Sequence, residues 1–177
     1  MTAAVVVDTN VILVANAGHA NASPECVIEC VNRLQQLMCN GSIAIDDAYR
    51  IVKEYQNKTS PRAGKGVGDV FLKWVLTHMA NPNRVQQVTL TEISADQFVE
   101  FPVSVLEAMF DRPDRKFASV ANAHPGKPPI WQAVDCKWLD WWPQLQAAGV
   151  QVDFLCGEDV CRFYQRKFPG KLVPALP

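Results

Sequence analysis

Acidic side chains follow two apolar segments that are typical of buried strands. Asp8 comes directly after the run AVVV, and Asp135 comes directly after the run PIWQAV. The carboxyl ends of parallel strands line the ligand crevice of an open α/β sheet, so we expect both carboxylates at one edge. Asp114, from the first turn of a predicted helix, and Glu54, from the helix after the second strand, are placed to join them.

A cluster of carboxylates suits a divalent metal ion. Carboxylates held close together repel one another and take up protons unless a cation neutralises them. Oxygen ligands favour Mg2+ or Mn2+, and such ions lower the pKa of a bound water and stabilise an in-line phosphoryl displacement. The predicted chemistry is metal-dependent hydrolysis of phosphodiester bonds, with these catalytic residues and metal ligands: Asp8, Glu54, Asp114 and Asp135.

Two other aspartates compete for this role. Asp140, five residues after Asp135, is a further candidate metal or water ligand, or else an acid in the first turn of a helix. Asp111 precedes Asp114, but the helical phase favours Asp114. Each acid alone also fits a turn, a helix cap or a solvated face. The joint arrangement therefore carries the prediction.

Cations near these acids are candidates for contacts with substrate phosphates, although an ordinary solvated face explains them equally well. They are Lys58, Arg62 and Lys65 in the exposed loop NKTSPRAGKGVG, and Arg115 and Lys116 beside Asp114. Three tryptophans could stack on unpaired bases, but a core or a subunit interface is the commoner place for such a cluster. They are Trp138, Trp141 and Trp142.

Five short apolar segments alternate with helical patterns along the chain. As strands they cover Ala4 to Val7, Ser42 to Ile45, Val85 to Leu90, Pro129 to Val134 and Val150 to Leu155. Strands separated by helices imply crossover connections and a mostly parallel sheet covered on both faces. We therefore predict an α/β fold. Thr91 to Arg112 yields no clear assignment.

Capping residues mark the helix boundaries. Ser23 stands before a first-turn proline, and Asp46 or Asp47 can cap the helix that carries Glu54. Gly149 can end the helix that precedes the last strand.

The chain has 177 residues, 49% of them hydrophobic, and a formal net charge of -1. We expect one domain over residues 1–177, with a core of about 4–156 and a C-terminal helix and tail over 157–177. The charge excludes a global basic surface, so any nucleic acid must be held locally. The first twenty residues read as neither a signal peptide nor a membrane span. We therefore expect a cytoplasmic protein without a membrane partner, whose six cysteines are thiols.

Four blocks of the sequence resemble the PIN-domain nuclease family, in the family's order. Asp8 lies in VVVDTNVIL and Glu54 in IDDAYRIVKEY, while Asp114 lies in DRPDRKFASVANAH and Asp135 in PPIWQAVDCKWLDWWPQLQAAGVQVDFL. Each of these acids stands at an acidic position of the family, and DTN is the most specific motif. The blocks span nearly the whole chain, from Val5 to about Cys156.

The resemblance implies a three-layer, flavodoxin-like α/β/α fold, a Mg2+ or Mn2+ site and, usually, RNA as the substrate. It implies that Asn10 orients a carboxylate or a water where the substrate binds. The family often has Ser or Thr two positions before the fourth acid, where this chain has Ala133. An endoribonuclease of this kind can be a toxin restrained by an antitoxin protein, and family members often form homodimers.

Two other functions stay open. One is a PIN-like binding or regulatory module without catalysis, against which the four acids argue. The other is a phosphatase of the haloacid-dehalogenase type, which also begins with a strand and an aspartate. That mechanism needs a second Asp two residues later, where this chain has Asn10.

Overall fold

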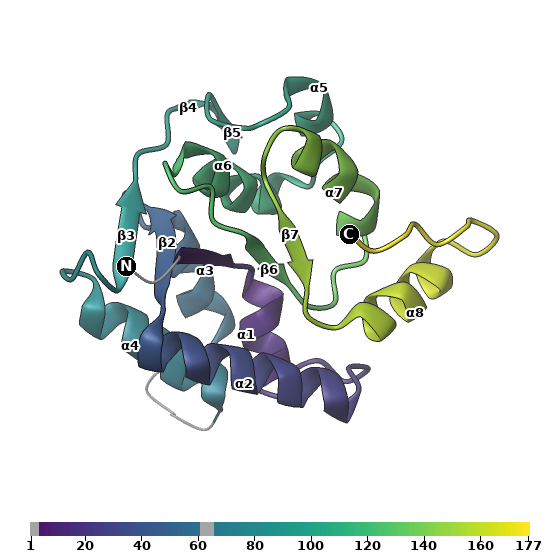
Figure 1. Ribbon diagram of the computed structural model, residues 1–177, viewed down its shortest axis with the longest axis horizontal. Helices are drawn as coiled ribbons and strands as arrows, with labels where there is room; N and C mark the ends of the chain where they lie inside the picture. Colours follow the sequence, from purple (N-terminus) through teal and green to yellow (C-terminus); the bar gives the residue numbers. More distant parts are fainter. Residues whose placement is uncertain (1–3, 61–65) are drawn as a thin grey trace.

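Five parallel strands form the central sheet of the computed structural model, which describes residues 4–60 and 66–177. The strand order is β3-β2-β1-β6-β7 (Figure 1). Their bounds are β1 Ala4–Val7, β2 Ser42–Asp46, β3 Val85–Val88, β6 Ile130–Gln132 and β7 Val152–Phe154. All five predicted strands are therefore present, and the predicted parallel sheet is confirmed.

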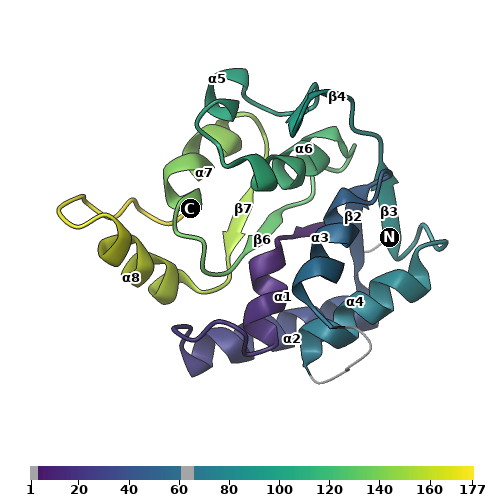
Figure 2. The same cartoon turned by 180° about the vertical axis from the view of Figure 1, so that it is seen from behind.

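Helices cover both faces of the sheet and give a three-layer α/β/α fold (Figures 1 and 2). One group is α1 Thr9–Ala15, α2 Pro24–Asn40, α3 Arg50–Lys58 and α4 Val67–His78. The opposite group contains α6 Arg115–Ala123, which follows the 3-10 turn Arg112–Asp114, and α7 Trp138–Ala147. The last helix, α8 Gly157–Lys167, packs beside α7 through a small apolar cluster that includes Leu139, Val160 and Tyr164.

The predicted helix ends at Ser23 and Gly149 are present, whereas Tyr49 occupies the N-cap position of α3 and Asp46 bonds to that helix from the end of β2. Ser23 Oγ accepts a hydrogen bond from the Cys26 amide at 3.2 Å, and the carboxylate of Asp46 accepts from the first two amides of α3 at 2.9 and 3.0 Å. Gly149 adopts a φ of +85°, which a residue without a side chain adopts most easily, and the chain turns there into β7.

The segment without a sequence assignment forms a small excursion beside α6. Strands β4 Glu92–Ser94 and β5 Gln97–Phe98 pair as an antiparallel hairpin, and α5 Ser104–Glu107 follows. These elements are two to four residues long, so they are too short for a periodic pattern to indicate.

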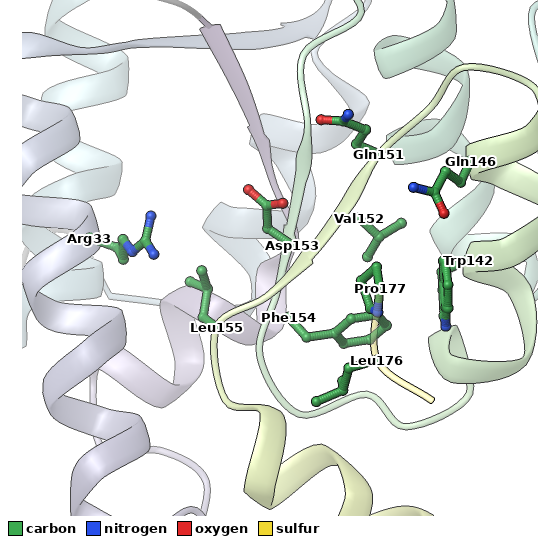
Figure 3. Close-up of a pocket in the computed structure, with 10 residues that line it drawn as sticks. All are labelled: Arg33, Trp142, Gln146, Gln151, Val152, Asp153, Phe154, Leu155, Leu176 and Pro177. Carbon is green, nitrogen blue, oxygen red and sulfur yellow. The ribbon is translucent and has the colours of Figure 1, made fainter. Parts of the chain in front are cut away.

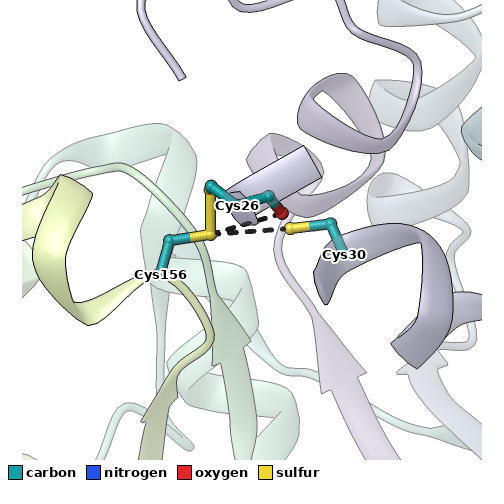
Figure 4. A group of neighbouring side chains, drawn as sticks. All are labelled: Cys26, Cys30 and Cys156. Carbon is teal, nitrogen blue, oxygen red and sulfur yellow. Dashed lines mark hydrogen bonds between the residues drawn. A yellow bond between two sulfur atoms is a disulfide. The ribbon is translucent and has the colours of Figure 1, made fainter. Parts of the chain in front are cut away.

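The expectation of six thiols is wrong for one pair, because Cys26 and Cys156 form a disulfide (Figure 4). The bridge joins the first turn of α2 to the residue before α8, and Cys30 Sγ lies 3.8 Å from Cys156 Sγ. Disulfides are typical of oxidising compartments, so the cysteines give no support to a cytoplasmic location, which stays a prediction. None of the helices in the described ranges is long and apolar enough to span a membrane.

Candidate metal centre

The predicted acids meet in a cavity of about 570 Å³ at the carboxyl ends of β1 and β6. Helices α1, α3 and α8 contribute to its walls, and so does Asp114 directly before α6. Its charged and polar lining consists of Asp8, Thr9, Asn10, His19, Asn21, Glu54, Lys58, Asp114, Asp135, Arg166 and Lys167. The structure therefore brings together all four acids that the sequence placed at this edge.

Asp8 is the most buried acid of the group, with 4% of its surface exposed. Its Oδ1 accepts hydrogen bonds from the amide and the side-chain nitrogen of Asn10, at 2.9 and 2.7 Å. Its Oδ2 is buried and has no hydrogen-bond partner among the described residues. Burial, together with the charges of Asp135 and Glu54, raises the pKa of Asp8 from 3.8 to about 7, against the opposing effects of the Asn10 amide and Lys116.

Asn10 fixes the orientation of Asp8. Its Oδ1 accepts from the backbone amides of Ala133 at 2.8 Å and Val134 at 3.3 Å, and its Nδ2 also donates to Gln132. The side chain thereby ties the start of α1 to the end of β6. The expectation that Asn10 orients a carboxylate agrees with this geometry, and the position without Ser or Thr contributes a backbone amide instead.

Asp114 and Asp135 form the second part of the cluster, together with Asp111. One carboxylate oxygen from each of these three residues lies within 4.8 Å of the corresponding oxygens of the other two. Burial raises the pKa of Asp114 to about 9, with further increases from Asp8, Asp135 and Asp111. Burial also raises the pKa of Asp135, although the Lys137 amide and the nearby Lys167 oppose it. The sequence set Asp111 aside, whereas the structure places it beside Asp114.

Glu54 enters the cavity already paired. Its Oε1 accepts from Thr9 Oγ1, and its Oε2 accepts from Lys116 Nζ, both at 2.5 Å. Lys116 also donates to the carbonyl of Pro113 and is 7% exposed. The predicted phosphate contact of Lys116 is therefore wrong, because its ammonium faces a carboxylate inside the protein.

Arg115 is also not available to a substrate phosphate. It is 5% exposed, and its Nε donates to the carbonyl of Phe110 at 3.2 Å. Lys58, the last residue of α3, lines the cavity, and its contact with a substrate phosphate stays a prediction. Arg62 and Lys65 lie outside the described residues. Asp140 is not among the residues that line the cavity; it accepts a hydrogen bond from the Tyr164 hydroxyl at 2.7 Å, within the contact of α7 with α8.

The tryptophans belong largely to the core. Trp138 and Trp141 are buried and pack against Phe110, with ring centroids 5.0 and 4.0 Å from it. Trp142 lines a different cavity of about 540 Å³ beside β7 (Figure 3). That cavity contains one carboxylate side chain, Asp153, so it lacks the convergence of acids seen at the carboxyl edge.

Sequence reasoning missed one wall of the cavity, which α8 provides. Phe163, Arg166 and Lys167 line it, and so does His19 from the segment between α1 and α2. Phe163, Arg166 and Lys167 are three and four residues apart, and this spacing could have indicated a shared helix face. Nothing in the sequence indicated that this face lies against the end of β1.

Comparisons with protein-family models, with curated proteins and with solved structures found no match. The resemblance to PIN-domain nucleases therefore stays a prediction.

Proposed function

We propose that this protein is a metal-dependent nuclease that hydrolyses phosphodiester bonds in RNA, as an endoribonuclease. One observation carries the proposal. Five carboxylates gather at the edge of the sheet, and three of them have no ion-pair partner among the described residues: Asp8, Asp114 and Asp135. Burial raises the pKa of each of these three.

The two remaining acids have lysine partners. Lys116 pairs with Glu54, and Lys137 pairs with Asp111. A carboxylate without a charged partner is costly when it is removed from water, so buried Asp8, with its bare Oδ2, and half-buried Asp114 and Asp135 in the same cavity fit a divalent cation. The donors are all oxygens, which suits Mg2+ or Mn2+.

The chain's own residues would divide the work at such a site. Asp8, Asp114 and Asp135 would hold the ion, and Asn10 keeps Asp8 in place. Glu54, fixed by Thr9 and Lys116, would accept a proton or a hydrogen bond from a water at the cavity wall. A bound Mg2+ or Mn2+ would supply charge stabilisation for the phosphoryl displacement and acidify a water.

RNA as the substrate, and an antitoxin protein or a second copy of the chain as partners, are proposals that rest on the family resemblance. The lining cations, Lys58, Arg166 and Lys167, support an anionic polymer as the ligand. A haloacid-dehalogenase-type phosphatase has less support, because the amide of Asn10 is committed to Asp8 and to the backbone after β6 and is no general acid.

The test is cleavage of end-labelled single-stranded RNA and DNA by the purified chain with Mn2+ and with EDTA. We expect cleavage of RNA with Mn2+, its loss with EDTA, and its loss in Asp8→Asn and Asp114→Asn. Asp153→Asn, which removes an exposed acid that lines the other cavity, is the matched control and should cut normally. Metal-independent cleavage, or full activity in either cluster variant, would contradict the proposal. Binding of RNA without any cleavage would favour the regulatory module.

A further inference from the structure

One face of α8 presents an aromatic ring and two cations to the acidic cavity. Phe163, Arg166 and Lys167 are three and four residues apart, so they lie on one side of the helix, and all three line the cavity. Opposite them, the ring of His19 lies 5.3 Å from the ring of Phe163, with an angle of 49° between the planes.

The aromatic pair is held in place by the residues around it. Arg162 packs its guanidinium 5.1 Å from the Phe163 ring and donates to the carbonyl of Asn21 at 3.0 Å. The same guanidinium donates to Asp159 at 2.8 Å, and Asp159 accepts from the Ser23 amide at 2.7 Å. These bonds join α8 to the segment that carries His19, so the two rings keep their relative position without a ligand.

Phe163 and His19 are each half-buried, and both contribute surface to the cavity wall. A ring that served the core alone would be expected to turn away from a cavity lined by acids and cations. Because the two ring planes are tilted by 49°, one ring can lie face to face with a nucleobase while the other borders it, and stacking of this kind tolerates any base.

We propose that Phe163 and His19 form a subsite that stacks on one unpaired base of the substrate strand, with Arg166 and Lys167 contacting the backbone phosphates beside it. The inference rests on the proposed function and deepens it, because it selects single-stranded nucleic acid. A paired base has both faces covered by its neighbours in the duplex. The subsite is therefore closed to an intact double helix.

The test measures binding rather than cleavage, in the full chain carrying Asp114→Asn to suppress turnover. The probes are a fluorescently labelled single-stranded 12-nucleotide RNA and the same strand with single abasic positions. We expect Phe163→Leu to weaken binding of the intact strand by about 5- to 100-fold. It should change binding of the strand with the critical abasic position by less than about 2-fold, because the stacked base is already missing.

Phe154→Leu is the matched control, since Phe154 is a half-buried ring of β7 that lines the other cavity. It should leave binding unchanged, and Phe163→Tyr should retain it. Equal losses on the intact and abasic strands would overturn the proposal. If Phe163→Leu does not fold, the abasic scan is done with the unmutated subsite. The proposal is then overturned if no abasic position weakens binding.

This result is separable from the nuclease proposal. A chain that shows base-dependent binding but no cleavage would leave the subsite standing and overturn the nuclease. A chain that cuts RNA without sensitivity to abasic positions would overturn the subsite alone. Binding of the blunt duplex form as tightly as the single strand, with the same dependence on Phe163, would also contradict the inference.

Discussion

Replacing Asp8 with Asn should stabilise the metal-free protein at alkaline pH. Asp8 is buried, its Oδ2 has no partner among the described residues, and its pKa is raised from 3.8 to about 7, mainly by burial. When a carboxyl has a higher pKa in the folded than in the unfolded state, the folded protein loses stability as that carboxyl ionises. The contribution of Asp8 to the free energy of unfolding is zero below about pH 4. It becomes increasingly unfavourable between pH 4 and 7 and stays unfavourable above pH 7.

The size of the effect follows from that pKa. The rise from 3.8 to about 7 corresponds to a penalty on the order of 4 kcal/mol at pH 8 and roughly 1.5 kcal/mol at pH 5. An Asn at this position leaves one buried amide donor unpaired, which costs about 1–3 kcal/mol at either pH. We therefore expect a net gain of about 1–3 kcal/mol at pH 8 and little or no gain at pH 5.

Urea unfolding of the two proteins in EDTA measures this difference. The diagnostic quantity is the change in relative stability between pH 5 and pH 8, about 2–3 kcal/mol in favour of the variant, because the cost of the unpaired amide cancels. Asp153→Asn, at an exposed position outside the cavity, is the control for the loss of one carboxylate. A relative stability of Asp8→Asn that is the same at both pH values would refute the reasoning, since it would mean that Asp8 is already ionised without cost.

Three further outcomes are expected. Lys116→Met should lower the free energy of unfolding at pH 7 by about 1–3 kcal/mol, because it leaves Glu54 without its ion-pair partner near other carboxylates. Urea unfolding measures this change, and unchanged stability would show that the ion pair does not stabilise the fold. Cys156→Ser should cost about 2–5 kcal/mol in the same assay by opening a disulfide loop that spans 130 residues, and a loss below about 0.5 kcal/mol would count against the bridge. Neutralising Arg166 and Lys167 together should lower the slope of log affinity for single-stranded RNA against log salt by about 1.4, and an unaltered slope would remove α8 from the binding surface.

The sheet and the position of its acids were predictable from the sequence. Short apolar runs such as the one before Asp8 are typical of buried parallel strands, and the topology of such sheets places the next residue at the carboxyl edge. Ser23 and Gly149 marked helix ends correctly because capping depends on local backbone chemistry.

The direction of the charged side chains was not predictable in the same way. Lys116 and Arg115 follow an acid in a polar stretch, which reads as solvated surface, yet both are buried. The partner of Lys116 is Glu54, 62 residues earlier, and only the docking of α3 against α6 brings them together.

Long-range contacts also decided the remaining parts of the site. The disulfide joins residues 130 positions apart, and the α8 face that carries Phe163 meets the cavity only through packing against α7 and the segment before α2. Asp111 and Asp114 both reach the cluster because Asp111 directly precedes a 3-10 turn and Asp114 ends it, so the two do not lie on one regular α-helix. Helical phase alone therefore could not choose between them.

The most direct test of the proposed metal centre is calorimetric titration of Mn2+ into the metal-free protein at pH 7.5, in two buffers that differ in ionisation enthalpy. Asp114, with a pKa of about 9, carries a proton at this pH that a bound cation must displace. We predict saturable binding to the wild type with release of about one proton, and weak or absent binding to Asp114→Asn. Absence of saturable binding to the wild type, or equal affinity and proton release in the variant, would contradict the claim that these carboxylates form a metal centre.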